Sequence, residues 1–382
     1  MAYNSRDKSP VEEIFRIIWR PTPLVILSFA SASLIFVFFR SKSLKNILFV
    51  SWAANSSDAD VDSTSTSTPS PSSGEEFKSI GKPLCYVDTD LYKGCIYLDY
   101  NATTPVYPEV ASKIAPFIAS CFGNPSSSHI FSDPAKLAVR TARTLVGNLI
   151  NSANPEREIY FTSCGTESDN RAIDIAIAHH INCLAPGSGS ILPNIITSAI
   201  EHPAVLCYLR LLKSQGKISL TVIEVDESGL VRDELIQSSL SIATALVTIM
   251  HSNNEVGTIQ PLRKIADVVK AFNKANKVHI LLHSDAAQSI GKVCVDVQSM
   301  HVDLLTIVGH KFGAPKGVAA LYVREEVRWE PAAQPMLVGG GQEHGGRGGR
   351  SVFSAQTVHL SIFNRTLHKY TYCTYIHTLL RH

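Results

Sequence analysis

A lysine and an aspartate stand at the ends of two apolar runs of the sequence, where strands of a sheet would end. Lys311 follows the run 304–308, and Asp285 follows the run 280–282. An ammonium group is costly to bury unless its pKa falls or a covalent bond consumes it, so this lysine suggests a Schiff base with a carbonyl. A solvated loop lysine is the alternative for Lys311 taken alone. An aspartate two strand ends away would suit the protonated ring nitrogen of pyridoxal phosphate.

Three further apolar runs end in polar residues that suit a bound ligand. Gly165 and Thr166 lie in a small-residue turn, TSCGTES, before a helical pattern, and a helix N-terminus of this kind binds phosphate or carboxylate groups. A plain helix cap is the alternative. His202 follows a fourth run, where its ring would either stack on a planar cofactor or cap a helix. Asn254 follows a fifth run and either offers an amide or closes a tight turn.

Strands and helices that could position these residues are predicted within residues 96–338, where short β-branched runs alternate with longer helical patterns. Such alternation predicts an α/β fold of three layers, in which helices cover both faces of a mainly parallel sheet. Ligands of such sheets collect beyond the carboxyl ends of the strands, so polar strand ends on one edge predict a site. We expect seven strands, at 158–162, 195–198, 219–225, 245–250, 280–283, 304–308 and 319–323. The expected helices include 134–150, 168–180, 204–214 and 263–276.

Composition excludes several classes of protein. The 382 residues include 35 Lys and Arg against 33 Asp and Glu, and a net charge of +2 offers no field that would attract nucleic acid. An apolar content of 45% is too high for a wholly disordered chain. The eight cysteines form no CxxC pair, so we expect neither a disulfide-dense scaffold nor a metal site, and a reducing compartment is favoured.

The N-terminal segment 1–54 contains sixteen consecutive uncharged residues, LVILSFASASLIFVFF. With their neighbours they predict a single-pass membrane anchor at 22–40; a cleaved signal peptide and a segment without a membrane role are the alternatives. Basic residues on both sides leave the orientation open, and we expect a cytoplasm-facing catalytic domain. The Ser/Thr/Pro-rich segment 55–76 is typical of a disordered linker. The folded domain is then expected at 77–343, followed by a glycine-rich, irregular tail at 344–382.

Eight segments, in a fixed order, are similar to those of a known family. They are YLDYNATTPVYPEV at 97–110, FGNPSSSH at 122–129, FTSCGTESDN at 161–170, EHPAV at 201–205, HSNNEVGTIQP at 251–261, HSDAAQSIGK at 283–292, VDLLTIVGHKFGAPKGVAALYVR at 302–324 and GGGQE at 339–343. On these segments the chain resembles the pyridoxal-phosphate cysteine desulfurases and selenocysteine lyases, which are fold-type I, class V aminotransferases. The resemblance implies the large domain of that fold and a homodimer.

The resemblance also implies roles for individual residues. Lys311 would bond covalently to pyridoxal 5'-phosphate and move protons at the substrate, Asp285 would keep the pyridine nitrogen protonated, and His202 would stack on the ring. The other implied cofactor contacts are Gly165, Thr166 and His310 at the phosphate, Gln288 at the phenolic oxygen, and Asn254 near the cofactor and substrate. The implied reaction removes sulfur from L-cysteine or selenium from L-selenocysteine and leaves L-alanine, with a sulfur or selenium acceptor protein downstream. Segments such as VTIM and LLTIVGHKF slightly favour selenocysteine lyase.

Three departures from the family pattern limit these implications. Cys164 stands where glycine or alanine is usual, Val308 where many members have a serine, and Arg350 where a phosphate-binding threonine is expected. Residues 351–382 lack similarity, so we expect the small C-terminal domain, with its catalytic cysteine loop, to be missing. The alternatives are a catalytically impaired, cofactor-binding truncated isoform and a non-catalytic, partner-binding relative. RNA binding through GGRGGR is not favoured, because two arginines are too few.

Overall fold

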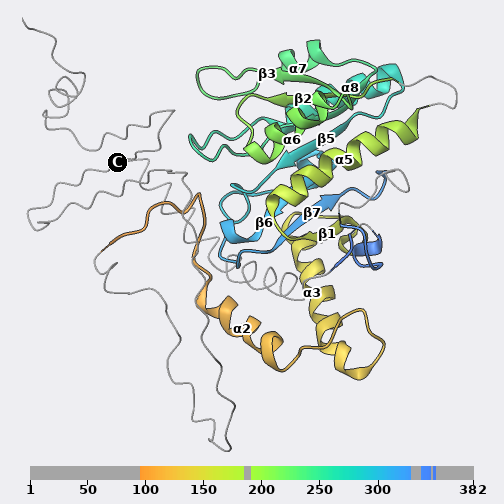
Figure 1. The fold of residues 1–382 in the computed structure, drawn as a ribbon. Coiled ribbons are helices and arrows are strands. Elements are labelled where there is room, and N and C mark those ends of the chain that lie inside the picture. Colours follow the sequence, from red (N-terminus) through yellow and green to blue (C-terminus); the bar gives the residue numbers. More distant parts are fainter. Residues whose placement is uncertain (1–94, 185–190, 328–336, 346, 350–382) are drawn as a thin grey trace, which may run out of the picture. The chain divides into compact units, whose positions relative to one another are not determined.

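The computed structural model describes residues 95–184, 191–327, 337–345 and 347–349 (Figure 1). The chain divides into two units, Met1–Val87 and Asp88–His382, and all of the described residues belong to the second. The predicted anchor and linker, and the tail beyond residue 349, lie outside the described residues. Among the helices that the structure does describe, none combines the length and the apolar character needed to span a bilayer.

Seven strands of the described residues form one sheet, in the order β1-β7-β6-β5-β4-β2-β3 (Figure 1). The pairs β2–β3, β2–β4, β4–β5 and β5–β6 are parallel, whereas β7 runs antiparallel to both of its neighbours, β1 and β6. Six strands therefore run in one direction, which confirms the predicted seven-stranded, mainly parallel sheet. The strands are β1 (Ile159–Thr162), β2 (Asn194–Ser198), β3 (Ser219–Ile223), β4 (Thr244–Thr248), β5 (Leu281–Asp285), β6 (Leu304–Val308) and β7 (Ala319–Val323).

Helices fill most of the connections between these strands. The described helices are α2 (Pro108–Ala119), α3 (Asp133–Leu149), α4 (Pro155–Glu158), α5 (Gly165–Cys183), α6 (Pro203–Ser214), α7 (Asp233–Ser239), α8 (Leu262–Asn276) and α9 (Val297–Met300). Short 3-10 turns occur at Ile130–Ser132, Gly309–Lys311 and Glu343–Gly345. The four helices expected from the sequence correspond to α3, α5, α6 and α8.

Successive residues of the central strands enter two separate hydrophobic cores. In β4, Leu246 packs in the core that includes residues of α5 and α6, whereas Val247 packs in the core that includes residues of α3 and α8. Leu281 and Leu282 of β5 divide in the same way. Side chains alternate between the faces of a strand, so this division means that helices cover both faces of the sheet. Burial on both faces explains why the strands are continuous apolar runs in the sequence.

The structure differs from the sequence expectations at element ends and in four of the described helices. Strand β5 extends through Asp285, so this carboxylate belongs to the last position of the strand instead of following it. The helices expected from the sequence do not include α2, which contains Pro116, or α4, α7 and α9, which have four, seven and four residues. A proline inside a helix and a very short helix both weaken the apolar periodicity on which such a prediction depends.

A buried ion pair joins the segment 337–345 to the body of the domain. The guanidinium of Arg143 in α3 donates to both carboxylate oxygens of Glu343, at 3.0 and 3.2 Å, and the two side chains are 2% and 1% exposed. The Glu343 carboxylate also accepts a hydrogen bond from the backbone N–H of Phe161 at 2.8 Å. The Arg143 guanidinium lies 5.1 Å from the centroid of the Phe161 ring. This segment is therefore fixed against β1.

Removing the charge of Glu343 is expected to destabilise the domain strongly. Glu343→Gln removes the buried carboxylate that pairs with the Arg143 guanidinium and leaves only the exposed Glu156 carboxylate, 3.8 Å from Nε, which costs about 3–5 kcal/mol of unfolding free energy. The measurement is the unfolding free energy of the full chain in urea. The control is Glu325→Gln, which removes an exposed ion pair with Arg157 and is expected to cost about 1 kcal/mol or less. Equal losses in the two variants would contradict the prediction.

Candidate cofactor site

The residues expected to do chemistry gather at one edge of the sheet. The strands β1, β2, β4, β5 and β6 run in the same direction, so their carboxyl ends share that edge. The turn before Gly165 follows β1. His202 follows β2, and Asn254 follows β4. Asp285 is the last residue of β5, and Lys311 follows β6. Strands β5 and β6 are neighbours, which brings the aspartate and the lysine to adjacent strand ends.

Lys311 lies at the end of the turn that follows β6 and is partly buried. Its Nζ donates hydrogen bonds to the carbonyl oxygens of Asn101, at 2.7 Å, and Ala102, at 2.9 Å. Burial lowers the pKa of the Lys311 amine, while the charges of Asp285 and Asp99 act in the opposite direction. A lowered pKa increases the fraction of neutral amine, which is the form that attacks a carbonyl.

The segment that contacts Lys311 is held by the same turn. The carbonyl oxygen of His310 accepts hydrogen bonds from the N–H and hydroxyl of Thr104, at 2.8 and 2.9 Å. The N–H of Gly313 donates to Oγ1 of Thr104 at 2.8 Å, and Nδ1 of His310 lies 3.0 Å from Oγ1 of Thr103. Gly313 has a φ of +93°, and a side chain there would collide with the ring of Tyr107, so glycine is required. Burial lowers the pKa of His310, and the charges of two neighbouring lysines lower it further.

Asp285 offers a buried carboxylate to a cationic group. Its side chain is 6% exposed, and Oδ1 accepts a hydrogen bond from the N–H of Ala287 at 2.8 Å. Within the described part of the chain, no hydrogen-bond donor reaches Oδ2. Burial raises the pKa of Asp285, whereas the Ala287 N–H and the charges of His202 and Lys311 lower it. A pyridinium N–H would supply both the missing donor and a compensating charge.

A buried polar network extends from β5 beneath this carboxylate. The ring of His283 contacts the hydroxyls of Thr248, at 2.8 Å, and Thr306, at 3.1 Å. Oδ1 of Asp169 in α5 lies 3.9 Å from Nε2 of His283. Burial lowers the pKa of His283 to about 3 and raises the pKa of Asp169 well above its ordinary value. Asp169 and His283 are not among the residues predicted from sequence to act in the site, although they lie in the motifs FTSCGTESDN and HSDAAQSIGK.

Glu201 is a second buried acid that the sequence analysis did not single out. Its Oε1 accepts hydrogen bonds from the hydroxyl of Ser198, at 2.5 Å, and the N–H of Met250, at 2.9 Å. Burial raises the pKa of Glu201 to about 8. The residue directly precedes His202 in the motif EHPAV, which is the signal that would have identified it.

The turn between β1 and α5 has the form of an anion site. Helix α5 begins at Gly165, and the preceding residue, Cys164, makes no side-chain cap to the helix. A Cβ on Gly165 would lie 2.6 Å from Cγ2 of Val308, so a side chain cannot be accommodated there. Thr166, in the first turn of the helix, is exposed. The uncapped N–H groups and the positive end of the helix dipole therefore face solvent at the site edge.

His202 and Asn254 lie at the next strand ends. The Nδ1 atom of His202 accepts a hydrogen bond from the N–H of Ala204 at 3.1 Å, so the residue caps α6, as one of the two interpretations from sequence expects. The residue is nevertheless exposed, and its ring remains accessible to a stacking partner. Asn254 is partly buried, and its carbonyl oxygen accepts a hydrogen bond from Nδ2 of Asn101 at 3.1 Å.

Asn101 connects several residues of the site, although the sequence analysis gave it no role. Its carbonyl oxygen accepts from Nε2 of Gln288, at 2.9 Å, as well as from Lys311. Its Oδ1 accepts from Nζ of Lys292 at 3.0 Å, and the same Nζ lies 2.6 Å from Oε1 of Gln288. Asn101 belongs to the quoted motif YLDYNATTPVYPEV, which is the signal that marks this segment.

These residues fit pyridoxal phosphate as a set. The helix N-terminus at Gly165 suits a phosphate, because Val308 occupies the space that a side chain at position 165 would need. Asp285 suits the ring nitrogen, because Oδ2 receives no hydrogen bond from the described residues. The partly buried amine of Lys311 suits a covalent link to the aldehyde carbon.

Comparison with known proteins agrees with this arrangement. The sequence model of the aminotransferase class-V family matches residues 96–357. A cysteine desulfurase of Trichormus azollae is 44% identical over 254 residues, which are 66% of this chain and 58% of that protein. The cysteine desulfurase IscS of Clostridium botulinum, strain Hall, is 42% identical over 253 residues, again 66% of this chain and 58% of the relative. This chain thus spans 58% of the length of these curated relatives.

Solved structures show the same fold. A structure described as SspA in complex with cysteine superposes with a TM-score of 0.62 at 35% identity, over 70% of this chain and 72% of the other. A NifS-like protein superposes with a TM-score of 0.63 at 35% identity, over 71% and 70% of the two chains. The family match covers more than half of the chain, and the strand edge described above lies within the matched residues. This chain therefore belongs to the aminotransferase class-V family, among the pyridoxal-phosphate enzymes that include the cysteine desulfurases.

Proposed function

We propose that this chain binds pyridoxal 5'-phosphate at the strand edge and acts as a cysteine desulfurase. The observation that carries the proposal is the juxtaposition of Asp285 and Lys311 at the ends of the neighbouring strands β5 and β6. A buried carboxylate and a partly buried amine at that spacing serve the two ends of one planar cofactor. The relatives named as cysteine desulfurases support the choice of substrate.

The bound cofactor would supply an electron-withdrawing ring that stabilises negative charge at the substrate α-carbon. Asp285 would accept the ring N–H and, from its buried position, hold the proton on the ring nitrogen. The N–H groups of Gly165 and Thr166 would bind the phosphate, and His202 would pack its exposed ring on the cofactor face. His310 and Asn254 would border the phosphate and the substrate.

Lys311 would anchor the cofactor and then move protons at the substrate. Its amine now donates to the carbonyl oxygens of Asn101 and Ala102, so forming the covalent link requires these two hydrogen bonds to break. Gln288 donates to the same carbonyl of Asn101 and would become available to the phenolic oxygen when that segment shifts. Loading of the site is therefore expected to involve movement of the segment around Asn101.

The proposed reaction transfers the sulfur atom of L-cysteine to a thiol. The C–S bond of the substrate breaks, the acceptor thiol becomes a persulfide, and a proton completes L-alanine. L-selenocysteine is proposed as a second substrate, because the segments VTIM and LLTIVGHKF resemble those of selenocysteine lyases. A homodimer and a separate acceptor protein belong to the same proposal, as does a cytoplasm-facing domain tethered through residues 22–40.

The covalent link gives the first test. Adding pyridoxal phosphate to the full chain is expected to produce an absorbance band in the visible region that is lost in Lys311→Ala, because Lys311 supplies the amine at the end of β6. Lys316→Ala removes an exposed lysine of the following loop and is the control, expected to keep the band. A band of equal size in Lys311→Ala would contradict the proposal.

Turnover gives the second test. The chain loaded with pyridoxal phosphate is expected to release sulfide and L-alanine in equal amounts from L-cysteine in the presence of dithiothreitol. Asp285→Asn removes the negative charge that holds the ring proton and is expected to lower kcat about 10²-fold or more. Parallel assays with L-selenocysteine measure the preference between the two substrates. A visible band without any turnover would overturn the desulfurase proposal and support the non-catalytic alternative.

A further inference from the structure

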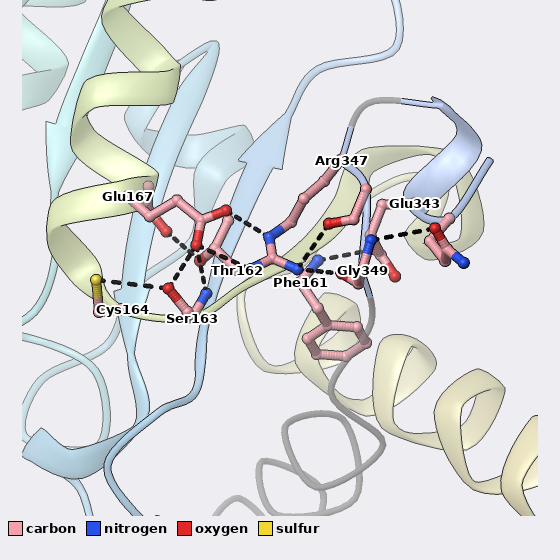
Figure 2. Close-up of polar contacts among 11 residues, drawn as sticks. Phe161, Thr162, Ser163, Cys164, Glu167, Glu343, Arg347 and Gly349 are labelled. Atoms are coloured by element: carbon pink, nitrogen blue, oxygen red, sulfur yellow. Dashed lines mark hydrogen bonds and ion pairs between the residues drawn. The ribbon is translucent and has the colours of Figure 1, made fainter. Parts of the chain in front are cut away.

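The turn before α5 is in contact with an arginine more than a hundred residues away in the sequence. Figure 2 shows Arg347 directed at Glu167, which lies in the first turn of α5. The Nε of Arg347 donates to Oε1 of Glu167, and Nη2 donates to Oε2 at 3.2 Å. The side chains are 15% and 11% exposed. A two-pronged, largely buried arginine–carboxylate pair of this kind has a defined geometry.

The same carboxylate also fixes the turn itself. Oε2 of Glu167 accepts hydrogen bonds from the N–H of Ser163, at 2.8 Å, and from its hydroxyl, at 2.5 Å. Although burial raises the pKa of Glu167, the hydrogen bonds from Arg347 and Ser163 bring it below its ordinary value. Glu167 is therefore ionised at neutral pH, and its orientation sets the position of the residue that opens the turn.

An ionised Glu167 creates an electrostatic problem for a phosphate. Glu167 is two residues beyond Gly165, at the helix N-terminus that we propose as the phosphate site. A fixed negative charge there repels a dianion and uses up part of the favourable helix potential. The guanidinium of Arg347 compensates the carboxylate charge, so the helix N-terminus remains attractive to the phosphate.

The segment that carries Arg347 is itself well anchored. The Nη1 of Arg347 donates to the carbonyl oxygens of Gly348 and Gly349, so the segment folds around its own guanidinium. The N–H of Gly349 donates to Oε1 of Gln342 at 3.2 Å. Glu343 is fixed by its buried pair with Arg143. The arginine is thus presented to Glu167 by a loop that is tied to the domain.

We propose that Arg347 is a positioning residue for the cofactor phosphate, acting through Glu167. It neutralises the carboxylate in the first turn of α5 and, through that carboxylate, fixes Ser163 at the start of the phosphate turn. The inference rests on the proposed function, because it takes the turn at Gly165 as the phosphate site. It adds to that function a role for a residue that does not itself need to touch the phosphate.

The test compares ligands with and without a phosphate. The dissociation constants of pyridoxal phosphate and of pyridoxal are measured on the full chain by titration of the Lys311-dependent band. Arg347→Met is expected to weaken pyridoxal phosphate about 10-fold and pyridoxal less than about 2-fold, because only the former carries the dianion. Arg157→Met, which removes an exposed pair with Glu325, is the matched control and is expected to leave both constants unchanged.

A double-mutant cycle tests whether the effect passes through Glu167. Without the carboxylate there is no charge to neutralise, so the double variant Arg347→Met with Glu167→Gln is expected to regain pyridoxal phosphate affinity to within about 3-fold of the wild type. Arg347→Lys keeps the positive charge and is expected to stay within about 3-fold as well. Urea unfolding of every variant identifies any that do not fold. If Arg347→Met is one of them, the pyridoxal phosphate dissociation constants of Arg347→Lys and Glu167→Gln are compared in its place to decide whether the charge of Arg347 acts through Glu167.

Each result supports or overturns the inference. Equal weakening of pyridoxal and pyridoxal phosphate would show a general structural role and would overturn it. Failure of Glu167→Gln to rescue Arg347→Met would show that Arg347 acts without Glu167, which would also overturn it. A wild-type chain without a Lys311-dependent band would instead refute the proposed function, so the two failures are distinguishable.

Discussion

The geometry of the site depends on the close approach of Gly165 to Val308. Helix α5 begins where the side chain of Val308 occupies the space that a Cβ at position 165 would take, at 2.6 Å. Val308 is the last residue of β6 and Lys311 follows three residues later, so one packing contact fixes the spacing of the phosphate turn and the lysine. Packed cores tolerate small changes poorly, which makes this spacing more rigid than a set of exposed hydrogen bonds would.

The same contact explains how a valine serves where the resemblance leads one to expect a serine. A serine would offer one hydroxyl to the phosphate, whereas Val308 offers a surface against which the helix N-terminus packs. A larger share of the affinity for an anion then falls to backbone N–H groups and the helix dipole. These contributions are sensitive to nearby charge, which gives the Glu167–Arg347 pair its importance. Burial also acts at the ring end of the site, where it raises the pKa of Asp169 and of Asp285 and lowers the pKa of His283 to about 3.

The sequence predicts the strands and the edge of the sheet well, because both follow from local patterns. Apolar runs buried on both faces identify β6 and β7 to the residue, and the polar residues that follow such runs identify Asp285 and Lys311. The reversed direction of β7 and the network around His283 could not be predicted in the same way. Strand direction depends on pairing partners, and a histidine inside a buried strand becomes informative only when the threonines on neighbouring strands are in place.

The composition of the glycine-rich segment GGGQEHGGRGGR does not predict how the segment is held against the domain. Its arginine at 347 and its glutamate at 343 pair with Glu167 and Arg143, so each side of the contact supplies one acid and one base. A shift of four residues along the segment would place Arg347 beside Arg143 in one direction or Glu343 beside Glu167 in the other, so either shift brings like charges together. Because a buried like-charge contact costs far more than an exposed one, the order of the charges fixes the register of a segment that its glycines alone would leave undetermined.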